Sequence, residues 1–74
     1  MIRVKYLGFF SELAGASEKT FDLAEATVRE LVDPRVLEAS KGDLVVLVNG
    51  LPGSLDSRVR SGDVVAVLPH MGGG

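Results

Sequence analysis

The sequence predicts an α+β domain in which a small mixed sheet packs against one principal helix and a short extra helix. Three observations favour this class. Apolar and charged residues alternate at the start of the chain, a helix-start motif precedes apolar residues at helical spacing, and two strand-length apolar runs follow. The chain has 74 residues, enough for one hydrophobic core, so we expect one domain.

The first two elements are a strand and a short helix. Apolar residues alternate with Arg3 and Lys5, which predicts a strand over residues 2–7 with one buried face. In residues 9–15 apolar side chains recur at spacings of three and four, which predicts one or two helical turns. Gly15 can end that helix in the left-handed conformation.

The next part of the chain predicts a second strand and the start of the principal helix. A strand over residues 20–23 would turn Phe21 and Leu23 toward the core. Thr27 and Glu30 have the spacing of a capping box, in which each side chain bonds the other residue's amide. One apolar stripe should then face the sheet, formed by Val28, Leu31, Val32 and Val36.

Pro34 interrupts this helical pattern. Proline inside a helix costs about 3 kcal/mol, but at the first position of a new helix it costs little. We therefore expect one helical segment through about Val32 and a second, capped by Asp33, that runs to about Ser40. Gly42 marks its end.

The second half of the chain predicts two apolar strands, over residues 44–48 and Val64–Leu68. Asn49 and Gly50 form a tight-turn signal after the first of them. Residues 51–61 are predicted to be a polar connection, in which the apolar side chains Leu55 and Val59 reach the core. Both strands are apolar on two faces, so the face away from the helix is covered by loops and the short helix or is left for a partner.

Composition narrows the possible functions. The chain is 46% hydrophobic and 24% charged, which is ordinary for a globular domain, and it has no cysteine to form a disulfide, persulfide or thioester. The formal charge is −2 with scattered basic residues, so we expect no nucleic-acid partner. No apolar run approaches the ~20 residues that span a bilayer, and no secretory signal is recognised, so we expect a cytoplasmic protein that does not bind membranes.

No side chains form a recognisable catalytic or metal site in the sequence. His70 is the only histidine and has no cysteine or second histidine at ligand spacing. The carboxylates of the first half are explained by helix capping and solvation, and no serine has a partner histidine in a known motif. We therefore expect no metal, no cofactor and no enzymatic activity of the chain's own.

The last residues allow two interpretations. A fixed conformation of Gly72, Gly73 and Gly74 is unfavourable in free energy, because glycine loses more backbone entropy on ordering than any other residue. They are either a frayed end or a thin tail that carries the carboxylate of Gly74 into a narrow active site. Composition alone does not decide between these interpretations.

The whole chain resembles the ubiquitin-like sulfur carriers, and most closely the small subunit of molybdopterin synthase. The resemblance rests on five segments in this order: residues 9–15, 26–31, 48–50, 62–65 and 73–74. It implies a β-grasp (ubiquitin-like) fold, with a domain over residues 1–69 and a flexible tail over residues 70–74.

This resemblance also implies a chemistry for the tail. An ATP-dependent activating enzyme would adenylate Gly74, and sulfur transfer would then give a thiocarboxylate, since AMP is a good leaving group. The molybdopterin synthase large subunit, or another acceptor, would receive the sulfur. Gly73 and Gly72 would form the approach to Gly74. Leu68, His70 and Met71 are also predicted to contact partners; the alternatives are that His70 is simply a solvent-exposed tail residue and that Met71 packs on the chain's own sheet.

The sequence departs from this family at the start of the tail. Molybdopterin-type tails usually show an aromatic residue and two prolines before two glycines, whereas residues 68–71 read Leu-Pro-His-Met and three glycines follow. The early helical segment argues against the thiamine-type carriers, which generally lack it. A ubiquitin-like modifier joined through Gly74 to lysines, a sulfur donor for tRNA thiolation, and a β-grasp protein-binding module remain as alternatives.

Overall fold

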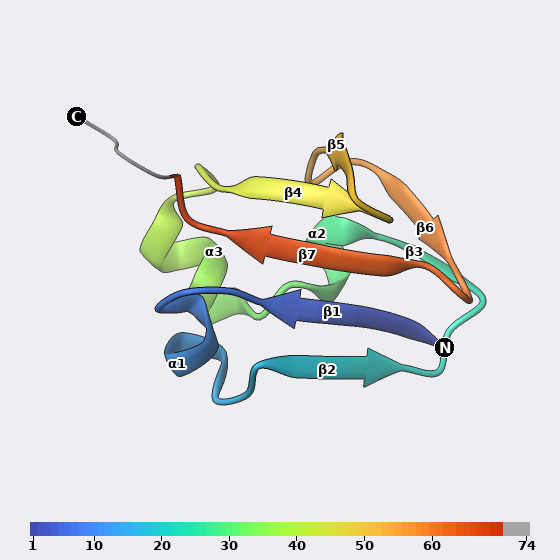
Figure 1. Ribbon diagram of the computed structural model, residues 1–74, viewed down its shortest axis with the longest axis horizontal. Coiled ribbons are helices and arrows are strands. Elements are labelled where there is room, and N and C mark those ends of the chain that lie inside the picture. The colour runs from blue at the N-terminus through green and yellow to red at the C-terminus, as the bar shows by residue number, and fades with distance from the viewer. Residues whose placement is uncertain (71–74) are drawn as a thin grey trace.

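The computed structural model describes residues 1–70, and it contains a five-stranded sheet and a separate two-stranded sheet (Figure 1). The elements in chain order are β1 (Ile2–Tyr6), α1 (Phe10–Ala14), β2 (Glu18–Phe21), β3 (Glu25–Thr27), α2 (Val28–Leu31), α3 (Pro34–Ser40), β4 (Val45–Val48), β5 (Leu51–Gly53), β6 (Arg58–Arg60) and β7 (Val64–Leu68). This arrangement confirms the predicted α+β class and its β-grasp form.

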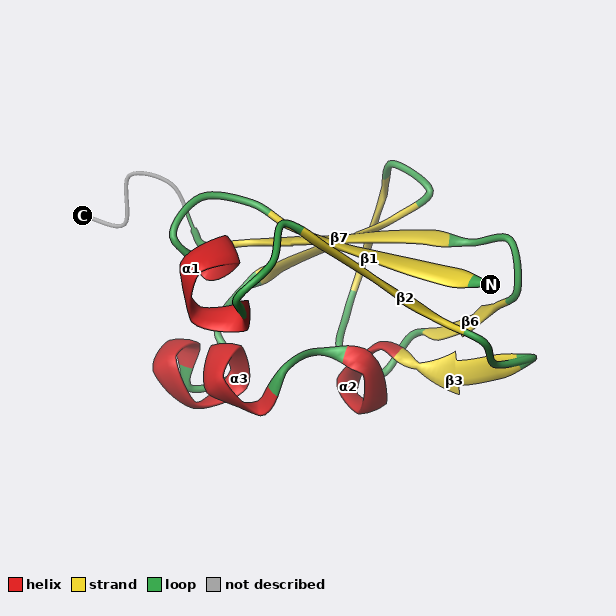
Figure 2. Cartoon of the chain, turned by 90° about the horizontal axis from the view of Figure 1, so that it is seen from below, coloured by secondary structure: helices red, strands yellow, loops and turns green. Residues whose placement is uncertain are grey.

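The large sheet has the strand order β2-β1-β7-β4-β5. Strands β1 and β7 are parallel, and the other neighbours are antiparallel. Figure 2 shows all three helices on one side of this sheet. The largest fully buried side chains come from the large sheet, from the helices and, in the case of Val59, from β6 of the small sheet: Phe10, Ile2, Val4, Val28, Val36, Val59, Val65 and Val67.

The helix signals in the sequence are confirmed in detail. The hydroxyl of Thr27 accepts a hydrogen bond from the Glu30 amide at 3.3 Å, and the Glu30 carboxylate accepts one from the Thr27 amide at 2.9 Å. Asp33 caps α3, where its carboxylate accepts from the Arg35 amide at 2.8 Å and Pro34 occupies the first helical position. The break before Pro34 therefore divides the predicted principal helix into α2 and α3, as expected from the cost of an interior proline.

Two left-handed residues end α3. Lys41 has φ 54° and Gly42 has φ 76°, and their amides bond carbonyl groups of the last helical turn. The sequence prediction named Gly42 alone, but the left-handed conformation begins one residue earlier, at a lysine.

The second strand was predicted two residues too late. Strand β2 covers Glu18–Phe21, because its ladder with β1 pairs Glu18 with Lys5 and Phe21 with Ile2 and ends where β1 begins. Leu23 follows this ladder and is 45% exposed, so the prediction that it meets the core was wrong. Phe21 is partly buried and does pack against the core.

The predicted polar connection over residues 51–61 contains two short strands. Strand β5 pairs with β4 across the predicted turn, and β6 pairs with β3, which the sequence did not indicate. Pro52 is tolerated in β5 because that strand lies at the sheet edge. Leu55 and Val59 are buried, as predicted.

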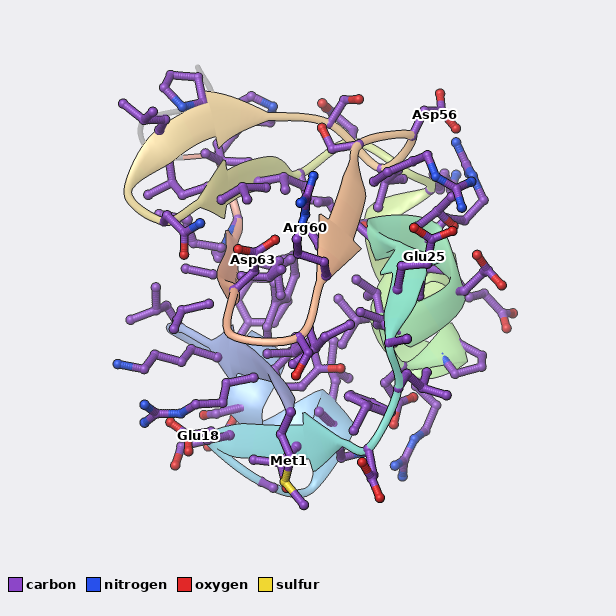
Figure 3. The ribbon with its side chains drawn as sticks, turned by 90° about the vertical axis from the view of Figure 1, so that its right-hand side faces the viewer. Met1, Glu18, Glu25, Asp56, Arg60 and Asp63 are labelled. Carbon is purple, nitrogen blue, oxygen red and sulfur yellow. The ribbon has the colours of Figure 1, made fainter. Side chains whose placement is uncertain are left out.

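Asp63 connects the small sheet to the large one at the end of the molecule shown in Figure 3. Its carboxylate accepts hydrogen bonds from the Arg60 amide at 2.8 Å and from the Asn49 side chain at 3.0 Å. The Arg60 amide and the Asn49 side chain hold the pKa of the Asp63 carboxyl below its usual value.

Among the described residues, no helix is both long and apolar enough to cross a membrane.

Candidate functional site

The predicted site residues lie at and beyond the end of β7. Leu68 is the last residue of this strand, half-buried and opposite Val45 of β4, and His70 is exposed two residues later. The remaining predicted residues lie outside the described residues: Met71, Gly72, Gly73 and Gly74. The structure therefore describes the base from which the predicted tail continues.

The loop between β1 and α1 holds one side of this base. The Leu7 amide donates a 3.0 Å hydrogen bond to the Val67 carbonyl, which extends the contact of β1 with β7 by one residue. Gly8 follows with φ 60°, and a Cβ atom built there would lie 3.5 Å from the Pro69 ring. Gly8 adopts a left-handed conformation that favours glycine, so the loop can turn here while the Gly8 backbone stays close to the Pro69 ring.

The loop between α3 and β4 holds the other side. His70 Nε2 lies 2.9 Å from Asp43 Oδ1, and the contact is an ion pair when the imidazole is protonated. Both side chains are well exposed, His70 by 53% and Asp43 by 81%. Asp43 was not among the predicted site residues.

The sheet face opposite the helices is divided into a charged half and an apolar half. Side chains on β1 and β2 are charged there except for the polar Thr20, and Arg3 of β1 forms a 3.0 Å ion pair with Glu18 of β2. On β7 and β4 the alternation places half-buried apolar side chains on this face: Val64, Ala66, Leu68, Val45 and Leu47. We call these five residues the outer apolar face; Figure 2 shows no helix on that side.

The β1–α1 loop also exposes apolar side chains close to Pro69. Leu7 is 46% exposed and Phe9 is 54% exposed, while Phe10 next to it is fully buried. The rings of Phe9 and Phe10 meet edge to face with centroids 4.9 Å apart. The helical spacing in the sequence could not show which of the two phenylalanines faces solvent.

The most strongly perturbed carboxyl group in the described chain is structural. The Asp33 side chain is 7% exposed and contacts Arg35 Nη2 at 3.0 Å and Lys19 Nζ at 2.9 Å. Hydrogen bonds from Arg35, then from Lys19, hold the pKa of Asp33 far below its usual value. The group stays anionic and joins α3 to β2, which is a packing role rather than acid–base chemistry.

Residues 1–70 contain no pocket that could enclose a small molecule and no group of three or more metal-ligating side chains. The features that distinguish this end of the molecule are therefore the outer apolar face and the two loops beside Pro69 and His70. Sequence reasoning named Leu68 and His70 but missed Asp43, Leu7 and Phe9, because the pairing of distant loops has no local signal.

Comparison with solved structures gives relatives of the same size. A putative molybdopterin converting factor, subunit 1, from Pyrococcus furiosus is 34% identical, with 92% of this chain and 94% of that chain covered and a TM-score of 0.69. Small archaeal modifier protein 1 of Haloferax volcanii is 26% identical over 92% of this chain and 94% of that chain, with a TM-score of 0.71. A structure of SAMP1 from Haloferax volcanii, also 26% identical, covers 99% of this chain and 98% of its own and has a TM-score of 0.74.

No curated protein sequence matches the chain. The model of the ThiS family, however, matches residues 4–74, which is nearly the whole sequence. This match and the structural relatives confirm the resemblance to the ubiquitin-like sulfur carriers and to the molybdopterin synthase small subunit. The chain belongs to the ThiS family.

Proposed function

We propose that this chain is a sulfur carrier for molybdopterin (or tungstopterin) cofactor synthesis, activated at the carboxylate of Gly74. The observation that carries the proposal is the placement of β7. This strand is central in the sheet, is held by β1 and β4, and leads directly into the glycine-rich end of a ThiS-family sequence. The similarity to a putative molybdopterin converting factor subunit supports the choice of pathway.

The proposed chemistry has two steps. A carboxylate oxygen of Gly74 attacks the α-phosphorus of ATP, which releases pyrophosphate and leaves an acyl-adenylate. Hydrosulfide supplied by a sulfur donor then attacks the carbonyl carbon, AMP leaves with the bonding electron pair, and loss of the sulfur-bound proton gives the thiocarboxylate. The carrier provides the reacting carbon, while the activating enzyme provides acid–base groups and oxyanion stabilisation.

The outer apolar face is the proposed docking surface for the activating enzyme. Its side chains are half-buried, uncovered by any helix, and lie on the two strands that border the base of the tail. Burying them against a partner is favourable at about 25 cal/mol per Å² of apolar surface. The charged half formed by Arg3, Lys5 and Glu18 would give such a complex its orientation.

The test is activation in vitro. The chain is incubated with a candidate activating enzyme, ATP and a sulfur donor, and intact-mass and fragment spectra are recorded. We expect a sulfur-for-oxygen mass increase located on Gly74, and no increase in a variant that lacks Gly73 and Gly74. If neither adenylate nor thiocarboxylate forms with the full chain, the proposal is wrong.

A protein modifier is the second candidate, favoured by the similarity to small archaeal modifier protein 1. In this case the activated Gly74 carbon would be attacked by a lysine amine of another protein, giving an isopeptide bond and releasing AMP or an enzyme thiol. The distinguishing measurement is mass spectrometry of cell extracts for lysine residues linked to Gly74. A simple binding module, in contrast, would keep its function when Gly73 and Gly74 are deleted.

A further inference from the structure

The contact between His70 and Asp43 continues the strand register beyond the end of the β4–β7 ladder. The last backbone pair in this antiparallel ladder is Val45 with Leu68. One further step along each chain brings Leu44 opposite Pro69, and a second brings Asp43 opposite His70. Their side chains meet at 2.9 Å at that position.

Pro69 ends the backbone hydrogen bonding between β7 and β1. The amides of Arg3 and Leu7 donate to the Asp63 and Val67 carbonyls, so residue 69 also turns its backbone toward β1, where proline has no amide hydrogen to donate. The parallel register on the other side continues in the same way, because Tyr6 pairs with Val67 and the next two steps bring Gly8 opposite Pro69. Gly8 therefore lies beside Pro69 on the β1 side, and Asp43 contacts the next residue, His70, on the β4 side.

We propose that Asp43 is a positioning residue for the tail. By pairing with His70 it keeps this residue in line with β7, and so fixes the residue to which the tail is joined. The pair also ends the outer apolar face, because the alternation that places Ala66 and Leu68 on that face places His70 there as well. This inference rests on the proposed function for its effect on activation, but not for the contact itself.

The first test needs no enzyme. Heteronuclear ¹⁵N–{¹H} NOE values of His70 are measured in the full chain and in Asp43→Ala. We expect the value at position 70 to fall in this variant and to recover in the double variant Asp43→His with His70→Asp, in which the two groups are exchanged. The matched control is Asp56→Ala. It removes a carboxylate of nearly the same exposure, 82% against 81% for Asp43, and its partner is Arg29 of α2 and not a residue beyond β7.

The second test measures activation by the activating enzyme. If Asp43 only positions the tail, Asp43→Ala should raise the KM for the carrier about two- to fivefold, the range for an exposed ion pair, and leave kcat unchanged. Asp56→Ala should match the wild-type chain. If Asp43→Ala and Asp56→Ala have equal NOE and KM values, Asp43 does not position the tail and this inference is wrong. If the wild-type chain is never adenylated, the proposed function is wrong, and the NOE measurement still tests the contact between Asp43 and His70.

Discussion

The hydroxyl of Tyr6 accepts a 2.9 Å hydrogen bond from the backbone amide of Asp33. Tyr6 is the last residue of β1, and Asp33 lies in the break between α2 and α3, so this bond joins the sheet to the point where the helical segment is divided. Both residues are buried. The position of α3 over the sheet therefore depends on a polar contact inside the core.

Tyr6→Phe should lower the free energy of unfolding by about 1–2 kcal/mol, because the buried Asp33 amide loses its partner. Urea unfolding followed by circular dichroism measures this change. Ser11→Ala is the control, since it removes an exposed hydroxyl that donates to the Gly8 carbonyl, and it should change stability by no more than about 0.5 kcal/mol. Equal stability of Tyr6→Phe and the wild-type chain would contradict the structural role of this bond.

Asp33→Asn should destabilise the domain by about 2 kcal/mol at pH 7, since it removes the charge that binds Lys19 and Arg35. The folded-state pKa of Asp33 is depressed, so the stabilisation is complete above the unfolded value of about 3.9 and is lost as the pH falls toward the folded value. The difference between variant and wild type should therefore be constant from pH 7 to pH 5 and shrink below about pH 4. A difference that is independent of pH down to pH 2 would contradict this assignment.

The elements with a strong local signal were predicted from the sequence. The alternation in β1 indicates a half-buried strand, the Thr27–Glu30 capping box starts α2, and Pro34 after a capping aspartate starts α3. The turn at Asn49 and Gly50 has φ values of 51° and 83°. Asparagine and glycine tolerate such positive values, so this pair of residues predicted the turn. In each case the physical cause lies within a few residues of sequence.

What the sequence did not reveal depends on pairing between distant segments. Strands β3 and β6 have three residues each and exist because they pair with each other, and each is too short for its alternation to be recognised in the sequence. Asp43 was not predicted for the same reason, because only the pairing of β4 with β7 brings its partner His70 beside it. The exposure of Leu23 also follows from a ladder that ends at Phe21.

Gly8→Ala should cost about 1 kcal/mol of stability, because φ 60° is unfavourable for any residue with a Cβ atom. The added Cβ would make an ordinary 3.5 Å contact with Pro69, so His70 should keep its chemical shifts. Gly50→Ala is the matched control, since φ is 83° and nothing lies within 4 Å, and it should cost a similar amount. Gly8→Val should additionally displace Pro69, seen as shifted His70 resonances; unchanged resonances would contradict the contact.

Ala66→Glu tests the outer apolar face as a docking surface. The side chain points away from the core, and its register neighbours are Lys5 on β1 and Leu47 on β4, so a carboxylate there has a cation beside it. Stability should therefore change by no more than about 1 kcal/mol, as checked by thermal unfolding.

In a complex with the activating enzyme, however, the same carboxylate would be buried among apolar side chains. We expect the KM for the carrier to rise about tenfold or more. Ala24→Glu is the control, because it makes the same substitution at an exposed position between β2 and β3, outside both halves of this face, and it should leave the KM within about twofold. If Ala66→Glu folds normally and is activated like the wild-type chain, the enzyme docks elsewhere, and the exposed side chains Leu7 and Phe9 become the next surface to test.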